Sequence, residues 1–293
     1  MSAAAPYEPL AKEAAKGFAN ASAYDAYRPS YPPEAVEALL KQLHIAGQAH
    51  ANVVEIASGT GKFTEQLAAR PENYNVIAIE PHAGMRAELE RKALRDVKVV
   101  DGHAAKMPVG DEWGDACIAA QSFHWFATDE AVNEIHRVLK EKAVFGMIWN
   151  VEDYNKPSSW KATTAWEQKL NNLIFSTSTD GRPRFRDQAW QEVFQKQLKS
   201  NPLQVIRDTL IDRLPKFSVP LGQDSVSWTV WLTEDALWNR FNTLSQIAVL
   251  EGEKKVAAQA WFKEALTMDD VERNEKGEVA VHGVTYFAWT DRM

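Results

Sequence analysis

A glycine-rich turn between an apolar run and a helix-forming segment is the stretch of the sequence best suited to hold a small ligand. Residues 53–56 form a short apolar run that contains one acid, Glu55. Such a run suits a central strand of a sheet that is covered on both faces. Gly59 and Gly61 follow, and glycine can adopt positive φ and let a ligand approach the bare backbone. The free N–H groups of the next helix point at the same place. The run predicts a strand-turn-helix cradle.

Two familiar phosphate-binding templates do not match this turn. A phosphate loop needs G-x-x-x-x-G-K-[S/T], but Ile56 stands in place of the first glycine and Phe63 follows Lys62. The dinucleotide fingerprint G-x-G-x-x-G needs a third small residue, where this chain has Thr64. The remaining pattern, E-x-x-x-G-x-G, resembles the first motif of class I S-adenosylmethionine-dependent methyltransferases. In that family the turn faces the methionine part of the cofactor.

A second acid stands one strand and one helix further along. Residues 75–80 are predicted as a buried strand, and Glu80 ends it 19 residues beyond Gly61. An acid at this place in a nucleotide-binding α/β unit accepts hydrogen bonds from ribose hydroxyls. The alternative is a solvated carboxylate or a helix-cap contact. Residues 83–93 are predicted as a helix with Met85 facing inward.

Two loops should complete the crevice. In the resembling family the loop of residues 101–108 covers the adenine; many members have an acid where this chain has His103, whose ring could stack on adenine or form one hydrogen bond. The other loop, residues 121–126, follows a predicted strand and contains His124 and Trp125. Ligands of open α/β sheets bind beyond the carboxyl ends of strands, so this loop should face the same cavity.

The alternation of strands and helices between residues 52 and 150 predicts the fold class, α/β with a doubly wound, mostly parallel sheet. With the two strands expected after residue 150, the sheet should be seven-stranded. We expect residues 1–150 to form an N-terminal cap segment and the cofactor-binding core. Residues 151–293 should form a helical, substrate-side insertion and the last two strands, at about 215–222 and 279–289. Helices are expected at residues 160–175, 187–198, 225–241 and 256–266.

The segment before the core adds to the resemblance. Residues 24–32 resemble the Y-x-x-x-R-P-x-Y-P entry segment of a methyltransferase subgroup that includes the fungal trans-aconitate-type enzymes, and there it folds over the cofactor. Arg28 could bind the cofactor carboxylate or an acidic substrate in bidentate fashion, or form a surface salt bridge. The resemblance covers residues 18–150 well and is mainly architectural beyond them.

The resemblance implies S-adenosyl-L-methionine as the cofactor, with S-adenosyl-L-homocysteine as its product, and it implies a set of binding residues. These are Tyr24, Arg28, Glu55, Ser58, Gly59, Thr60, Gly61, Glu80, Pro81, Met85, Gly102, His103, Ala104 and Gln121.

Methyl transfer is an in-line displacement that needs positioning and exclusion of water more than a nucleophile. A carboxylate acceptor needs no base; a hydroxyl or thiol would, and His124 could supply it. His124 and Trp125 are the candidate catalytic residues, with packing roles as the alternative. The chain lacks the motifs of nucleobase, arginine and metal-dependent catechol methyltransferases. We therefore expect no metal and O-methylation of a small organic molecule, with a non-methylating enzyme or a binding module as rivals.

The composition and the net charge of the chain limit the kinds of binding partner that we expect. The 293 residues are 45% hydrophobic and 25% charged, enough for a sizeable core. The net charge of −7 and pI near 5.6 argue against general nucleic-acid binding. The single cysteine, Cys117, lies in an apolar run and should be buried and inert. With no basic-apolar leader and no membrane-length apolar run, we expect a soluble, cytoplasmic protein. Eleven tryptophans, most of them after residue 148, could form core or a substrate pocket.

Overall fold

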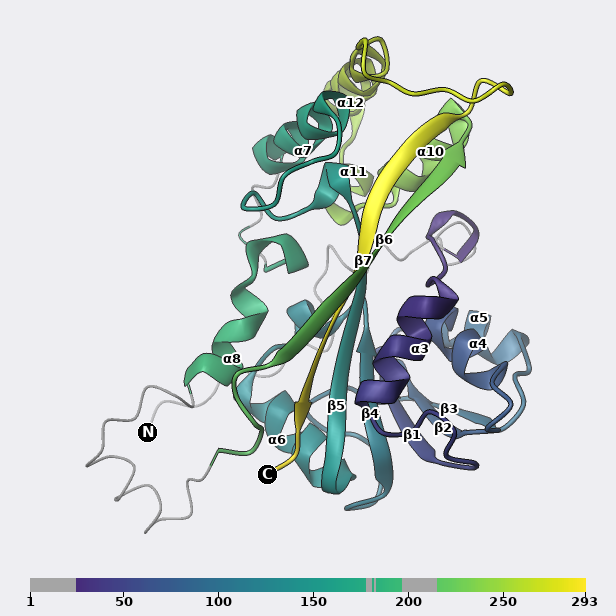
Figure 1. Cartoon of the computed structure of the whole chain (residues 1–293), viewed down its shortest axis with the longest axis vertical. Coiled ribbons are helices and arrows are strands. Elements are labelled where there is room, and N and C mark those ends of the chain that lie inside the picture. The colour runs from purple at the N-terminus through teal and green to yellow at the C-terminus, as the bar shows by residue number, and fades with distance from the viewer. Residues whose placement is uncertain (1–24, 178–180, 182, 197–214) are drawn as a thin grey trace.

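The computed structural model describes residues 25–177, 181, 183–196 and 215–293. It contains a seven-stranded sheet in the order β3-β2-β1-β4-β5-β7-β6 (Figure 1). The strands are β1 (Asn52–Ile56), β2 (Asn75–Ile79), β3 (Val97–Val100), β4 (Gly114–Ala120), β5 (Leu139–Glu152), β6 (Gly222–Leu232) and β7 (Val279–Asp291). The first five are parallel, and β7 pairs antiparallel with both β5 and β6. The predicted fold class is confirmed.

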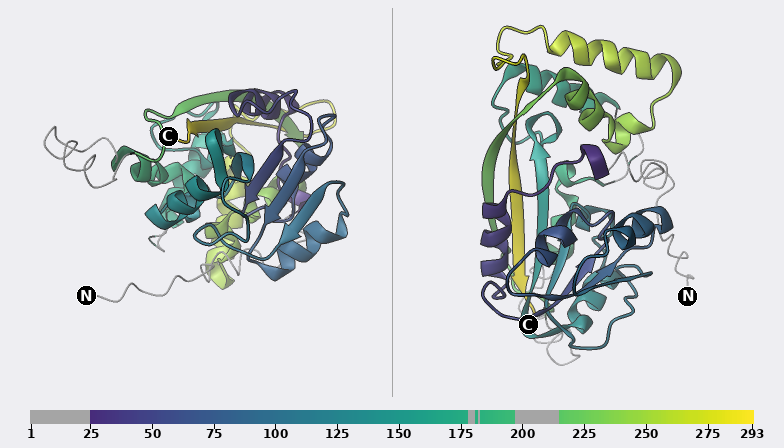
Figure 2. Two further views of the ribbon diagram at one scale, coloured as in Figure 1. Left: turned by 90° about the horizontal axis from the view of Figure 1, so that it is seen from below. Right: turned by 90° about the vertical axis from the view of Figure 1, so that its right-hand side faces the viewer.

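Helices cover both faces of the sheet (Figures 1 and 2). The described α-helices are α3 (Pro33–Gln42), α4 (Lys62–Ala68), α5 (Ala83–Arg91), α6 (Asp129–Val138), α7 (Ala165–Thr177), α8 (Glu192–Gln195), α10 (Glu234–Asn242), α11 (Ser245–Ala248) and α12 (Gly252–Ala265). Successive strand residues face opposite sides: Val53 packs in the cluster that contains residues of α3 and α4, and Val54 packs in the cluster that contains residues of α6. Burial on both faces explains why β1 reads as a continuous apolar run.

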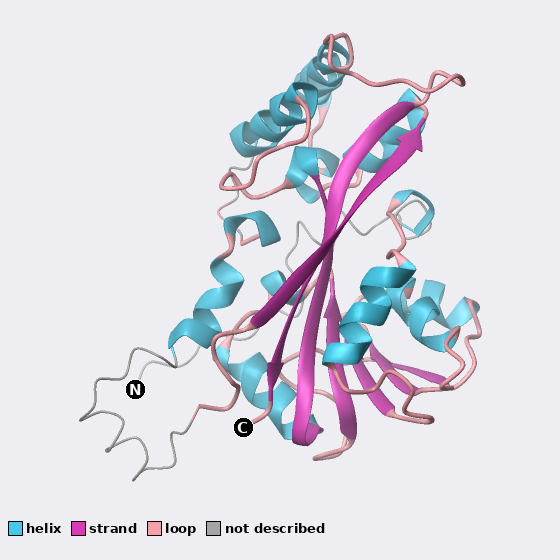
Figure 3. Ribbon diagram, viewed as in Figure 1, coloured by secondary structure: helices cyan, strands magenta, loops and turns pink. Residues whose placement is uncertain are grey.

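A helical cap stands over the carboxyl ends of the parallel strands (Figure 3). Its core is a third cluster, in which Trp166 and Leu170 of α7 pack with Phe241 of α10 and Phe262 of α12. The outer ends of β6 and β7 belong to this cluster, whereas Phe287 of β7 packs with the sheet. Two long antiparallel strands therefore join the cap to the core.

The predicted second-half elements need correction. The strand expected at about 215–222 is instead β6, Gly222–Leu232, and the helix expected at 225–241 is the end of β6 followed by α10. Along β6 half-buried residues alternate with exposed ones, the period of a strand. The tryptophans at 228 and 231 have a spacing that also suits a helix, and pairing with β7 overrides it.

Most of the other elements predicted for the second half of the chain match the structure, at least in part. The strand at 279–289 and the helix at 256–266 are confirmed as β7 and α12, and α7 covers most of the range 160–175. Only a short helix, α8, lies in the described part of 187–198. Cys117 is buried and has no disulfide partner, as predicted. None of the helices in the described ranges has the length and hydropathy required to cross a bilayer.

Candidate active site

The glycine turn leaves β1 with a tightly bent backbone. Ala57, Gly59 and Gly61 all have positive φ, at 52°, 60° and 88°, and α4 begins at the next residue, Lys62. A Cβ added to Gly59 would meet nothing closer than the sulfur of Met85, at 3.8 Å. The turn therefore exposes a stretch of bare backbone beside the start of α4, which is the arrangement predicted from the sequence.

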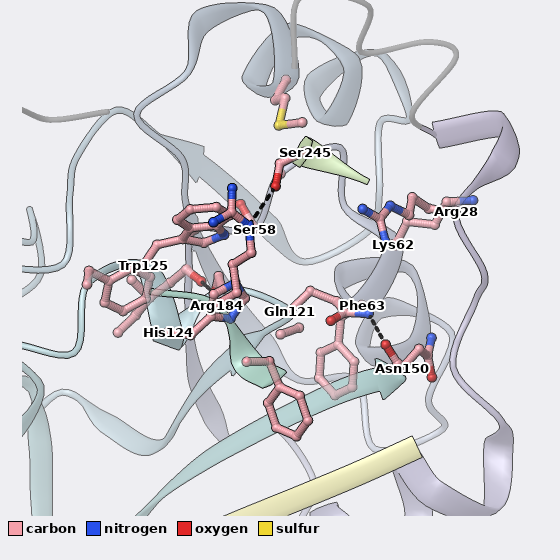
Figure 4. A pocket seen from close by; sticks show the side chains of 18 of the residues that line it. Arg28, Ser58, Lys62, Phe63, Gln121, His124, Trp125, Asn150, Arg184 and Ser245 are labelled. Atoms are coloured by element: carbon pink, nitrogen blue, oxygen red, sulfur yellow. Dashed lines mark hydrogen bonds between the residues drawn. The ribbon is translucent and has the colours of Figure 1, made fainter. Parts of the chain in front are cut away.

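A cavity of about 310 Å³ lies between this turn and the cap. Its walls come from the carboxyl ends of β1, β2, β4 and β5, from the segment before α3 and from the cap (Figure 4). The structure gathers most of the predicted site residues here: Arg28, Glu55, Ser58, Gly59, Thr60, Glu80, Pro81, Met85, His103, Ala104, Gln121, His124 and Trp125.

Three predicted residues do not join them. Tyr24 lies outside the described residues. Gly61 does not line the cavity, and a Cβ there would stand 2.3 Å from Cδ1 of Leu89, so Gly61 makes room for helix packing. Gly102 does not line it either, because a Cβ there would stand 2.7 Å from the ring of Pro108. At these two glycines the structure shows a packing requirement, and the predicted cofactor contact stays a prediction.

Glu80 is 4% exposed and is held by backbone groups. Its Oε2 accepts a hydrogen bond from Gly59 N at 2.8 Å, and its Oε1 accepts one from His82 N at 2.8 Å. Burial raises the pKa of this carboxyl, and the two backbone donors counteract the rise. Each oxygen keeps a second lone pair, so Glu80 can still accept a pair of hydroxyls from a ligand in the cavity.

Glu55 is fully buried, and only one of its two carboxyl oxygens has a hydrogen-bond partner among the described residues. Its Oε2 accepts a hydrogen bond from Thr64 Oγ1 at 2.7 Å, whereas Oε1 has no hydrogen-bond partner within the described ranges. Burial is the main reason that its pKa rises from 4.5 to about 8. A buried carboxyl with one unsatisfied oxygen in a cavity wall suits a ligand with a cationic N–H group.

Glu55 should make stability depend on pH. Between pH 4.5 and about pH 8 the folded state holds a proton that the unfolded state releases, so stability falls as pH rises through this window. The slope is at most about 1.4 kcal/mol per pH unit. We expect Glu55→Gln, which keeps an acceptor for Thr64, to flatten this slope in urea unfolding at several pH values. Equal slopes in both proteins would contradict the assignment.

The segment before α3 closes one side of the cavity. Asp25 Oδ1 accepts hydrogen bonds from Thr60 Oγ1 at 2.7 Å and from Lys92 Nζ at 3.0 Å. Arg28 lines the cavity and its Nη2 donates to the carbonyl of Thr243 in the cap at 3.1 Å. The side chain of Thr60 thus ties this segment to the glycine turn.

The backbone is also unusual where β4 ends. Gln121 has a φ of 58°, which is uncommon outside glycine, and its Nε2 donates to the carbonyl of Asn150 at 2.9 Å. Asn150 lines the cavity as well, and its own amide donates to the carbonyl of Ser30 at 3.1 Å. Backbone conformations of this kind gather at ligand sites. Nothing in the local sequence around Asn150 indicated its place in the wall.

His124 is the middle residue of the short 3-10 turn Phe123–Trp125 and is 8% exposed. Its Nδ1 accepts a hydrogen bond from Nε1 of Trp149 at 3.1 Å. Burial lowers the pKa of His124 to about 3, with help from the positive charges of Arg184, Arg186 and Arg28. The imidazole is therefore neutral in the free protein.

Sequence reasoning missed the two arginines of the cap. Arg184 and Arg186 are each 5% exposed and line the cavity. Arg184 Nε donates to Ser245 Oγ at 3.2 Å, and Arg186 Nη1 donates to Asn155 Oδ1 at 3.2 Å (Figure 4 shows the first). The signal available in the sequence was the placement of these two arginines on either side of Phe185, after a loop that contains Gly181 and Pro183. This signal does not by itself indicate a cavity. Among the described residues no cluster of histidine, cysteine and acids could hold a metal ion.

Known proteins resemble this chain in sequence and fold. A family model described as a methyltransferase domain matches residues 54–147. An uncharacterised methyltransferase-like protein of Schizosaccharomyces pombe is 33% identical over 58% of this chain, and the match spans 62% of that protein, less than two thirds of its length. An uncharacterised methyltransferase of Mycobacterium tuberculosis is 30% identical over 73% of this chain and 70% of its own length. A solved structure of a proposed type II methyltransferase from Anaeromyxobacter dehalogenans has a TM-score of 0.53 at 17% identity, covering 91% of this chain and 97% of that one.

Proposed function

This chain belongs to the methyltransferase family, and we propose that it transfers the methyl group of S-adenosylmethionine to a carboxylate oxygen of a small organic molecule. The observation that carries the proposal is the separation of acidic and basic side chains within one cavity. Buried acids, Glu55 and Glu80, stand at the glycine turn, and buried arginines, Arg184 and Arg186, stand at the cap.

The residues at the glycine turn fit the cofactor. The unsatisfied Oε1 of Glu55 matches the ammonium of the methionine part, whose positive charge would favour the ionised form of this carboxyl on binding. The backbone of residues 58–60 would lie along the same part. Glu80 would accept the ribose hydroxyls, and His103 with Ala104 would border the adenine. The sulfonium supplies an electrophilic methyl group; the protein supplies the position of the acceptor.

The cap end of the cavity suits an anionic acceptor. Arg184 and Arg186 present guanidinium groups, which pair with carboxylates in a planar, two-bond geometry. Their side chains are already held by Ser245 and Asn155, so little further ordering is needed when an anion binds. The same positive charge would hold the acceptor ionised.

A carboxylate acceptor also agrees with the protonation state of the site. During transfer the bond from sulfur to the methyl carbon breaks as a carboxylate oxygen attacks that carbon in line, and no proton has to move. A hydroxyl acceptor would need a base, and the pKa of His124, lowered by burial to about 3, leaves that ring a poor one. Water is kept away by the cap and by the segment that Asp25 ties to the turn.

Two measurements test the proposal in sequence. Calorimetry with S-adenosylhomocysteine should detect binding, and its absence would contradict the central claim and favour a binding module of another kind. Incubation with methyl-labelled S-adenosylmethionine and a metabolite extract should then give labelled products. Alkali releases methanol from methyl esters and leaves methyl ethers intact, so alkali-labile label is expected. Stable label would instead indicate an ether or a methylated nitrogen or carbon, and cofactor binding without label would favour another reaction.

Removing a cap arginine should weaken transfer while sparing the cofactor. Arg184→Gln and Arg186→Gln should each lower formation of alkali-labile product about 10- to 100-fold, the loss expected for one hydrogen bond to a charged group. Affinity for S-adenosylhomocysteine should stay within about two-fold. The matched control is Arg273→Gln, because Arg273 is exposed and pairs with Glu234 away from the cavity. Unchanged transfer in both cavity variants would refute the acceptor assignment.

A further inference from the structure

The hydrogen bond from Trp149 to His124 fixes which nitrogen of the imidazole ring carries the proton. Trp149, on β5, is fully buried, and its Nε1 lies 3.1 Å from His124 Nδ1. The indole nitrogen of tryptophan can donate a hydrogen bond but cannot accept one. Nδ1 must therefore carry the lone pair. In the neutral ring the proton then sits on Nε2.

Trp149 cannot easily turn away from this contact. Its ring lies 4.8 Å from that of Phe185, 4.8 Å from that of Trp190 and 6.1 Å from that of Tyr286, measured between ring centroids. A side chain packed on several sides loses those contacts in any other rotamer. The indole N–H is thus held toward the histidine by the packing of the core.

Nε2 is the ring nitrogen left for a ligand. His124 lines the cavity, Nδ1 is occupied in the wall, and Nε2 has no hydrogen-bond partner among the described residues. The charged groups that act on the ring are Arg184 and Arg186 of the cap and Arg28 of the segment before α3, and Trp125 lies beside it at 4.9 Å. All three charges are positive and disfavour a second proton on the ring.

We propose that Trp149 is a positioning residue, which fixes His124 as an Nε2–H donor to the acceptor molecule and prevents it from acting as a base. This inference rests on the proposed function for the identity of the acceptor. A base at Nε2 would need the tautomer with the proton on Nδ1, and that proton would face the indole N–H. The Nε2–H group would instead donate a hydrogen bond to the carboxylate oxygen that is not methylated. This hydrogen bond would orient the other oxygen, which takes the methyl group.

The tautomer can be read directly in the wild-type chain. Protein labelled with ¹⁵N in its histidines should show, for one ring, the neutral Nε2–H pattern from about pH 5 to about pH 9 without titrating. His124→Gln identifies that signal among the seven histidines. A His124 ring that carries its proton on Nδ1, or that titrates near neutrality, would overturn the proposal without any variant of Trp149.

A matched pair of tryptophan variants then tests the cause. In Trp149→Phe the ring of His124 should populate both tautomers and its apparent pKa should rise. Trp190→Phe is the control, because Trp190 is equally buried in the same aromatic group and its Nε1 has no partner among the described residues. It should leave the tautomer unchanged. Equal behaviour of the two variants would overturn the positioning role.

Failure of this inference can be separated from failure of the proposed function. The histidine spectra need neither cofactor nor acceptor, whereas calorimetry and labelling test those alone. Where labelled product forms, Trp149→Phe should lower the turnover number by about 10-fold and make it depend on pH, as expected when one positioning hydrogen bond is lost. Trp190→Phe should leave the rate independent of pH.

Discussion

Replacing Glu80 with alanine is expected to weaken the binding of S-adenosylhomocysteine by about 100-fold, or ~2.7 kcal/mol. The carboxylate would lose its hydrogen bonds to the ribose hydroxyls, each worth about 1.5–3 kcal/mol when the acceptor is charged. It also organises the turn, because it accepts from Gly59 N and His82 N in the free protein. In Glu80→Ala the N–H groups of Gly59 and His82 would lose their hydrogen-bond acceptor.

Calorimetry of the wild type and Glu80→Ala measures this loss. Glu90→Ala is the matched control, because Glu90 is an exposed acid on the neighbouring helix α5 and does not line the cavity. Glu80→Gln adds a second comparison, since glutamine keeps one acceptor oxygen and should lose less affinity than alanine. Affinity in Glu80→Ala equal to that of the control would mean that the cofactor does not contact this strand end.

Gly61→Ala is expected to lower the free energy of unfolding by about 3 kcal/mol. An alanine at a φ of 88° is strained, and its Cβ would stand 2.3 Å from Cδ1 of Leu89. Leu89 is buried in the cluster between α4 and the sheet, so it can move only by disturbing its neighbours. Urea unfolding of the two proteins gives the difference.

Gly47→Ala separates strain from crowding. Gly47 has a φ of 77°, and an added Cβ would meet nothing within 4 Å. Its loss should be about 1 kcal/mol, from backbone strain alone. Cofactor affinity of the folded Gly61→Ala protein should stay near that of the wild type. A stable Gly61→Ala protein with reduced affinity would instead return Gly61 to the binding surface.

The core of the fold and the cofactor end of the site were predictable because their signals are local. Glu55, Gly59 and Glu80 belong to consecutive strand-turn-helix units, and in a parallel sheet the carboxyl ends of adjacent strands meet at one edge. Buried strands read as apolar runs, and their alternation with helices indicated a doubly wound, mostly parallel sheet. For Gly61 and Gly102 the structure adds a packing requirement that the sequence did not indicate, since a turn glycine can serve a ligand or a neighbouring element.

The cap was predicted poorly because its signals are ambiguous and its contacts are distant. Trp228 and Trp231 have a spacing that a helix would accept, and only pairing with Gly283 and Ala280 of β7, much later in the chain, makes that segment a strand. Arg184 and Arg186 alternate in a short turn with no periodic context, so nothing local says that they enter the cavity. Their partners, Ser245 and Asn155, come from separate elements.

The sequence by itself determined the glycine-turn end of the cavity: a strand, a glycine turn and two acids at strand ends, all within one stretch of chain. The tertiary structure decided the acceptor side. It set the indole of Trp149, on β5, against Nδ1 of His124, in the turn that follows β4, and lowered the pKa of that ring. The physical reason is that a ring's tautomer and pKa depend on the groups packed around it, which neighbouring residues in the chain do not specify.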